Sequence, residues 1–392
     1  MKKPVKVVLT GGGTAGHVMP HIAMLPAYKE LGWTLNYIGS DGIEHKIISE
    51  QAKYIKYHSI MTGKLRRYFS WQNFLDVFKV IFGTLQSFSI LLMLRPTFVF
   101  SKGGFVSVPV SVAAWLLRIP IFTHESDLSP GLATKIIAPL SSKIFCTFPK
   151  TKKILNRANV SQVGLPVRRE LLLGDRETGA KYCGFDAGIK TILFMGGSLG
   201  AQRINECLET ILPELCESYQ IIHITGKGKN TEFRHEKYIS FEFVGGELPH
   251  LFALADYVVT RAGANSIFEF LALKKPMLLI PLEIGSRGDQ VENAAYFSQQ
   301  SYAMTLSEHK LSGEELKNSI NDLMASSAKI VASQTEFGKE GQTVDQILKE
   351  IKEYLKLNVS KTYRDFESVV LVFIAPNQSC GKISGPRNHS NI

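Results

Sequence analysis

Residues 5–17 read VKVVLTGGGTAGH, and this stretch decides the fold. The apolar run Val5–Thr10 predicts a β-strand, and the pattern from about Pro20 to Leu31 predicts a helix. Three consecutive glycines between them allow the backbone to approach a ligand closely. Because the start of a helix carries unpaired N–H groups and partial positive charge, we expect an anionic group at this turn.

The same alternation of short apolar runs and helical patterns continues along the chain and predicts doubly wound parallel sheets of the α/β class. At 392 residues the chain is long enough for two domains. A Gly-Pro turn at 163–168 marks the linker. We place the domains at 1–163 and 164–357, with a final helix near 344–355 that packs back on the first domain, and expect 358–392 to be a poorly ordered tail. Further strands are expected at 35–38, 98–100, 119–124, 191–195, 220–225, 239–244, 257–260 and 277–280.

Two more glycine-containing turns lead from a strand into a helix, at 195–201 (MGGSLGA) and at 260–269 (TRAGANSIFE). Each could hold a phosphate on exposed amides, and each could equally be only a tight β–α turn. Glu269 either completes a helix-capping box with Ser266 or presents its carboxylate to ribose hydroxyls. The polar loop 285–294 (GSRGDQVENA) offers side chains that both donate and accept hydrogen bonds, as sugar hydroxyls require.

Positive charge is concentrated in the first part of the chain. Residues 1–165 contain 20 Lys and Arg against 7 Asp and Glu, whereas residues 166–392 contain 25 against 28. This asymmetry indicates an anionic partner for the first domain, either an acidic lipid surface or nucleic acid, although a solvated basic face is also possible. The five cysteines show no metal-binding spacing, which fits a reducing cytosol.

Basic and aromatic residues at 64–71 (KLRRYFSW) precede Phe74, Phe78, Phe82 and the charge-free run 80–94. Together with Trp115-Leu116, this composition suits anionic headgroups and their apolar boundary, although much of the set could be core. The charge-free runs 80–94 and 103–117 are 15 residues each, too short to span a bilayer. We therefore expect membrane contact at the surface only.

Seven ordered motifs resemble those of one family. They are 11–17 (GGGTAGH), 101–109 (SKGGFVSVP), 124–127 (HESD), 164–168 (GLPVR), 196–201 (GGSLGA), 261–264 (RAGA) and 289–290 (DQ). Over residues 4–355 the chain is similar to the UDP-N-acetylglucosamine transferases that act on undecaprenyl-diphospho-muramoyl-pentapeptide. This resemblance implies the GT-B fold, an inverting transfer, and conversion of lipid I to lipid II in peptidoglycan synthesis at the cytoplasmic face of the plasma membrane.

The resemblance also implies which domain binds which substrate. The first domain would hold the lipid acceptor and the anionic inner leaflet, and the second would hold UDP-N-acetylglucosamine. The binding residues implied by the motifs, with those from the polar loop, are Thr14, Ala15, Gly16 and Asp127 on the acceptor side and Arg168, Ser198, Val244, Ala264, Asn265, Ser266, Ile267, Phe268, Glu269, Asp289 and Gln290 on the donor side. Ala15 stands where the family has glycine, and Asp127 where it often has an amide.

An inverting transfer needs a base near the acceptor hydroxyl and stabilisation of the departing diphosphate. His17 is our candidate for the base or for binding the acceptor diphosphate, with a helix-capping histidine as the rival interpretation, and Glu125 is a second base candidate. The chain has no Asp-x-Asp motif, so we expect no metal and no obligatory cofactor, with helix starts and Arg168 stabilising the diphosphate.

Several other functions remain open at this point. A related transferase acting on diacylglycerol would share the fold and donor, and a catalytically weak paralogue would bind the donor without turnover. An NAD-linked oxidoreductase would need a different first loop, because His17 crowds the helix start and no acidic residue closes the second strand. Nucleic acid is not an expected partner, whereas other cell-wall enzymes are.

Overall fold

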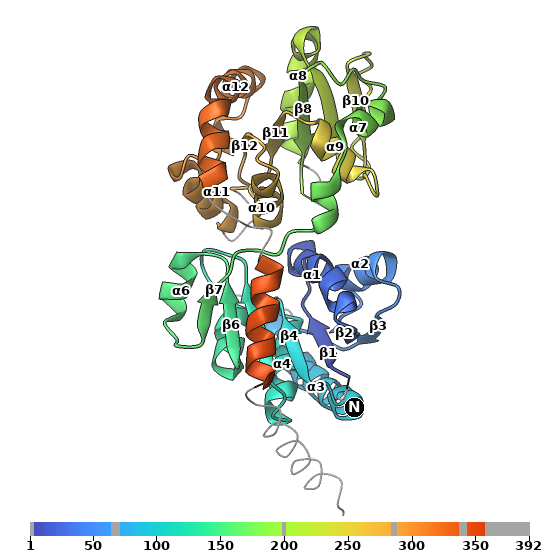
Figure 1. Ribbon diagram of the computed structural model, residues 1–392, viewed down its shortest axis with the longest axis vertical. Coiled ribbons are helices and arrows are strands. Elements are labelled where there is room, and N and C mark those ends of the chain that lie inside the picture. The colour runs from blue at the N-terminus through green and yellow to red at the C-terminus, as the bar shows by residue number, and fades with distance from the viewer. Residues whose placement is uncertain (1–3, 64–70, 198–200, 284–287, 337–342, 357–392) are drawn as a thin grey trace, which may run out of the picture.

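The computed structural model describes residues 4–63, 71–197, 201–283, 288–336 and 343–356. Within these residues the chain forms two parallel sheets, each covered by helices and each in its own lobe (Figure 1). The expected tail at 358–392 lies outside the described residues. The two-sheet α/β architecture predicted from the alternating pattern is confirmed.

The N-terminal sheet has seven parallel strands in the order β3-β2-β1-β4-β5-β6-β7. Its strands are β1 Lys6–Thr10, β2 Thr34–Gly39, β3 Lys56–Ser59, β4 Phe98–Ser101, β5 Ile121–Glu125, β6 Lys143–Cys146 and β7 Val160–Gln162. Its helices are η1 Ala15–His17, α1 Met19–Glu30, α2 Ile43–Gln51, α3 Trp71–Leu94, α4 Ser107–Leu116, α5 Leu132–Ile137, η2 Ala138–Leu140 and α6 Pro149–Leu155.

The C-terminal sheet has six parallel strands in the order β10-β9-β8-β11-β12-β13. Its strands are β8 Thr191–Met195, β9 Gln220–Ile224, β10 Tyr238–Phe241, β11 Tyr257–Thr260, β12 Met277–Leu279 and β13 Met304–Thr305. Its helices are η3 Arg169–Leu173, α7 Arg176–Cys183, α8 Gln202–Ser218, α9 Leu248–Leu254, α10 Ala264–Ala272, α11 Asp289–Gln299, η4 Glu308–Lys310 and α12 Gly313–Glu336.

A helix at 343–356 returns from the C-terminal lobe and lies against the N-terminal sheet (Figure 1). Val344, Ile347, Leu348 and Ile351 are buried in the same core cluster as the first strand. Burying an aliphatic side chain of this size stabilises a fold by roughly 1.5–3 kcal/mol. The chain therefore crosses between the lobes twice, and the second crossing is held by a packed apolar face.

Helix α3 is longer than the charge-free run in the sequence suggested. Its segment 76–94 is long and apolar enough to cross a membrane by length and composition, and only 17% of its most apolar stretch is buried. One face of this helix is nevertheless attached to the N-terminal domain, because Ser87 and Leu91 are buried and α3 packs along α4. Because that face is packed against α4, α3 lies on the surface of the N-terminal domain.

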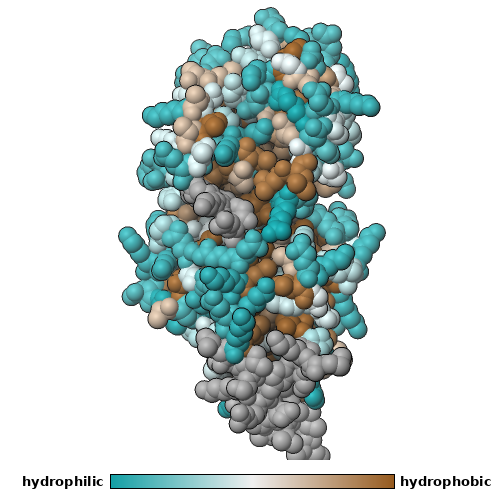
Figure 2. Space-filling model, in the orientation of Figure 1, coloured by the Kyte–Doolittle hydropathy of each residue, from teal (hydrophilic) through white to brown (hydrophobic). Residues whose placement is uncertain are grey.

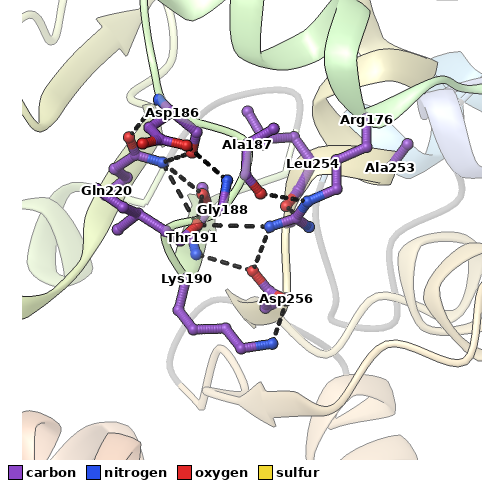
Figure 3. A network of polar contacts seen from close by, with 12 residues as sticks. Arg176, Asp186, Ala187, Gly188, Lys190, Thr191, Gln220, Ala253, Leu254 and Asp256 are labelled. Carbon is purple, nitrogen blue, oxygen red and sulfur yellow. Dashed lines mark hydrogen bonds and ion pairs between the residues drawn. The ribbon is translucent and has the colours of Figure 1, made fainter.

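Asp256 ties together the amino ends of the central strands in the C-terminal sheet (Figure 3). Its carboxylate accepts hydrogen bonds from the Thr191 amide at 2.9 Å, from Lys190 Nζ at 2.9 Å and from Arg176 Nη2 at 3.1 Å. The same Arg176 also donates to the carbonyl of Leu254, just before β11. This network fixes the end of the sheet opposite the strand ends that face the other lobe.

We predict that Asp256→Asn lowers the melting temperature at pH 7 by weakening these three bonds, with a loss of about 1–3 kcal/mol. Burial alone would raise the pKa of Asp256, but the Thr191 amide and the two cations outweigh it and leave the pKa below its ordinary value. A lowered pKa in the folded state stabilises the fold above the unfolded pKa of about 3.9, and this stability is lost as the pH falls. Thermal unfolding from pH 7 to pH 3 should therefore show the two proteins converging, and a constant difference would contradict the assignment.

Candidate active site

The candidate site lies where the strand order reverses in both sheets. In the N-terminal sheet, β2 and β3 lie on one side of the β1/β4 pair and β5 to β7 lie on the other. In the C-terminal sheet, β9 and β10 lie on one side of the β8/β11 pair and β12 and β13 lie on the other. Ligands of open α/β sheets bind at this switch point, beyond the carboxyl ends of the strands. The three glycine-containing turns of the sequence follow β1, β8 and β11, so all of them lie at a switch point.

The turn at 11–17 has a conformation that only glycine permits. Gly13 has a φ of 83°, and a Cβ on Gly12 would lie 2.5 Å from Cδ of Glu44. Tyr37 fixes the start of the turn by donating a hydrogen bond to the Gly11 carbonyl at 2.7 Å. A Cβ on Gly11 would lie 2.7 Å from the carbonyl oxygen of His17, so none of the three consecutive positions has room for a side chain without strain.

Glu44 occupies part of the turn that was expected to bind an anion. Its buried carboxylate accepts hydrogen bonds from the Gly13 amide at 3.1 Å and from both the amide and hydroxyl of Ser40. The Gly13 amide is therefore already used, and a carboxylate next to it repels a second anion. Any anion at this turn would have to bind further along, at Thr14–Gly16, where Thr14 and Gly16 are exposed.

His17 closes this turn at the end of η1 and is half-buried. Its Nδ1 lies 3.0 Å from the Thr14 hydroxyl, and this contact restrains the orientation of the ring. The carbonyl of Gly16 accepts a hydrogen bond at 3.4 Å from the side chain of Asn265, which belongs to the other lobe. The first glycine turn and the start of α10 therefore face each other.

Helix α10 offers free amides only in its first turn. Its first intrahelical bond runs from the Ile267 amide to the Gly263 carbonyl, so the amides of Ala264, Asn265 and Ser266 precede the regular ladder. The side chains of Ile267 and Phe268 are buried in the core of the domain. These two predicted site residues therefore do not present their side chains to a ligand between the lobes.

Glu269 of α10 is paired with Arg168, the last residue of the interdomain linker. The guanidinium donates to one carboxylate oxygen from Nε and from Nη2, both at 3.0 Å. Burial has the largest effect and raises the pKa of Glu269, while Arg168 acts in the opposite direction. Helix α10 begins at Ala264 without a side-chain cap, so the capping box between Ser266 and Glu269 is not formed.

Glu125 holds the loop that follows β5. Its two carboxylate oxygens accept hydrogen bonds from the amides of Asp127, at 3.0 Å, and Gly131, at 3.2 Å. In the same loop, Ser129 donates to Glu292 of α11 at 2.8 Å. This geometry favours a positioning role for Glu125 and places the loop of Asp127 beside the C-terminal lobe.

The remaining predicted donor residues come from several elements. Asp289 and Gln290 are the first residues of α11, and the Gln290 side-chain oxygen accepts from the Leu282 amide at 2.9 Å. Val244 is 6% exposed and packs in the domain core. Ser198 lies outside the described residues.

Two residues of this region were not expected from the sequence as site residues. Glu44 lies on α2, and nothing in its local pattern indicates that it reaches the glycine turn. Lys102 belongs to the motif 101–109, directly follows β4 and is buried. Within the described ranges, no group of three or more His, Cys, Asp or Glu could hold a metal ion.

Comparison with known proteins gives the family. Residues 7–146 match the glycosyltransferase family 28 N-terminal domain, and residues 191–351 match the glycosyltransferase family 28 C-terminal domain. A relative from Geobacillus kaustophilus is 52% identical over 81% of this chain and 90% of its own length. One from Clostridium perfringens is 46% identical over 89% of this chain and 98% of its own length. Both are named UDP-N-acetylglucosamine–N-acetylmuramyl-(pentapeptide) pyrophosphoryl-undecaprenol N-acetylglucosamine transferase.

Solved structures agree on the fold. The crystal structure of Acinetobacter baumannii MurG is 21% identical, with a TM-score of 0.67 over 88% of this chain and all of that chain. The calicheamicin glycosyltransferase CalG4 is 10% identical, with a TM-score of 0.67 over 90% of this chain and 99% of that chain. The chain belongs to glycosyltransferase family 28 and, within it, to the family of UDP-N-acetylglucosamine–N-acetylmuramyl-(pentapeptide) pyrophosphoryl-undecaprenol N-acetylglucosamine transferases.

Proposed function

We propose that this enzyme transfers N-acetylglucosamine from UDP-N-acetylglucosamine to undecaprenyl-diphospho-N-acetylmuramoyl-pentapeptide, converting lipid I to lipid II with inversion at the anomeric carbon. The observation that carries this proposal is the 46–52% identity to relatives of that name, which extends across both domains. The facing arrangement of the two switch points supports it, because donor and acceptor can each bind to one lobe.

The donor diphosphate is assigned to the start of α10. The amides of Ala264, Asn265 and Ser266 lie at the positive end of this helix, which suits a negatively charged group. Arg168 is held nearby by Glu269. Because a guanidinium has five N–H donors, its pairing with Glu269 leaves donors for the departing diphosphate. Glu269 is in turn available to orient Arg168 and to accept from a ribose hydroxyl.

The acceptor sugar is assigned to the N-terminal lobe, near Thr14–Gly16 and Asp127. His17 removes the proton from the acceptor hydroxyl as that oxygen attacks the anomeric carbon. Its hydrogen bond to Thr14 fixes the ring, and the contact between Gly16 and Asn265 brings the base close to the donor helix. The proposed donor side also includes Val244, Ser198, Asp289 and Gln290.

We predict that His17→Ala lowers transfer of labelled N-acetylglucosamine to lipid I by roughly 10²- to 10⁴-fold, because general-base assistance is lost. Binding of UDP to the other lobe, measured by calorimetry, should be retained. His58→Ala is the matched control, since His58 is hydrogen-bonded to Asn36 at the edge of the same sheet. Equal rates for the wild type and His17→Ala would reject the assignment of the base, and transfer to diacylglycerol in place of lipid I would reject the proposed acceptor.

A membrane-facing surface is proposed on the outer face of α3. Phe78, Ile81, Phe82 and Leu85 are each at least half exposed, and with Met61 they line an apolar depression of about 340 Å³. Trp115, exposed by 53%, lies at the end of the adjacent α4. In Figure 2 hydrophilic side chains cover much of the C-terminal lobe, while apolar ones gather where the lobes meet and over part of the N-terminal lobe.

Such a face suits the boundary between headgroups and acyl chains, with the basic charge of the N-terminal domain attracted to anionic lipid. The basic stretch 64–70 lies outside the described residues, as do the side chains of Trp71 and Phe74. The exposure of Phe78 and Phe82 argues against the alternative that these residues are core. We therefore propose peripheral attachment through α3 at the cytoplasmic face of the membrane.

We predict that Phe82→Glu weakens sedimentation with phosphatidylglycerol vesicles by roughly tenfold, because it places a charge on the apolar face next to anionic lipid. Leu173→Glu is the control, since Leu173 is 78% exposed on the C-terminal lobe. Vesicle binding that is equally strong in both variants would contradict the proposed surface.

A further inference from the structure

Lys102 lies at the switch point of the N-terminal sheet but is closed off from solvent. Its amide donates to the Thr10 carbonyl at 2.8 Å, which places it between the ends of β1 and β4, and the residue is only 2% exposed. A buried ammonium is costly unless a partner compensates its charge.

The partner of this ammonium is the loop after β5. Lys102 Nζ donates a hydrogen bond to the Ser126 hydroxyl. Ser126 stands between Glu125 and Asp127, and the Asp127 amide is bonded to the Glu125 carboxylate. The Asp127 carbonyl in turn accepts from the Thr151 hydroxyl at 2.8 Å. Lys102 is therefore the link that joins this loop to the end of β4.

Two carboxylates and one ammonium determine the charge of this region. Burial lowers the pKa of Lys102 to about 8, and Glu125 and Asp127 counteract that shift. The neighbouring His21 and His124 add no positive charge at neutral pH. Burial lowers the pKa of His21 to about 3 and holds the pKa of His124 well below its ordinary value.

We propose that Lys102 is a positioning residue for the acceptor, whose ammonium balances the carboxylates of Glu125 and Asp127 and, through Ser126, holds the loop 125–131 against the end of β4. The inference rests on the proposed function, because this loop is assigned to the acceptor side. Direct contact with the substrate is not its role, since the side chain is buried beneath the loop.

Removing the Lys102 ammonium should therefore be compensated by also removing the carboxylate charge of Asp127. In Lys102→Met the carboxylates of Glu125 and Asp127 repel each other without compensation, and the loop moves. We expect kcat/KM for lipid I to fall by roughly 10- to 100-fold, mainly through the acceptor KM. The double variant Lys102→Met/Asp127→Asn should recover most of that loss, although Asp127→Asn alone lowers activity.

The test is a double-mutant cycle on the full-length enzyme, with kcat and KM measured separately for lipid I and for UDP-N-acetylglucosamine. Lys275→Met is the matched control, because Lys275 is a half-buried lysine whose pKa is also lowered by burial to about 8, and its ammonium donates to backbone carbonyls in the C-terminal lobe. It should lower thermal stability and leave the acceptor KM unchanged. The donor KM should stay near the wild-type value in all Lys102 variants.

Additive losses in the cycle, or an unchanged acceptor KM in Lys102→Met, would overturn the proposal. If Lys102→Met does not fold, Ser126→Ala tests the same link with the charges intact, and it should raise the acceptor KM by roughly fivefold. An unchanged acceptor KM in Ser126→Ala would then overturn the proposal. Transfer by the wild type is measured in parallel, so its absence would count against the proposed function and not against this inference.

Discussion

The carboxyl ends of the two parallel sheets must face each other at the junction of the lobes, and the rest of the structure depends on this constraint. The packed helix at 343–356 and the Arg168–Glu269 ion pair act at the two places where the chain crosses between lobes. The bond from Asn265 to Gly16 then joins the start of α10 to the first glycine turn. Groups from both lobes thereby lie at the same junction.

The glycine-containing turns of the two lobes have similar sequences but differ in which groups they offer to an anion. In the N-terminal turn the Gly13 amide is taken by Glu44, and a carboxylate lies where an anion would otherwise bind. At the start of α10 the first amides precede the helix ladder, and Arg168 lies nearby. We therefore assign the strongest binding of the donor diphosphate to the C-terminal lobe, while the N-terminal turn positions His17.

Local pattern predicted the main strands and turns because their signals lie within a few residues. The bounds of β8 and β11 agree with the expected strands, and α1 begins one residue before its expected start. The short strands β3, β7 and β13 have only two to four residues and mix polar with apolar side chains, so they give no periodic signal. Glu44 and Lys102 contact residues that are far from them in the sequence, and such contacts leave no local sequence pattern.

The central claim is that helix-start amides and Arg168 hold the donor diphosphate without needing a divalent cation. Calorimetric titration of the enzyme with UDP and with uridine, both in the presence of EDTA, tests it most directly. The account predicts that UDP binds clearly more tightly than uridine under these conditions. Equal affinities, or UDP binding that appears only when a divalent cation is added, would contradict it.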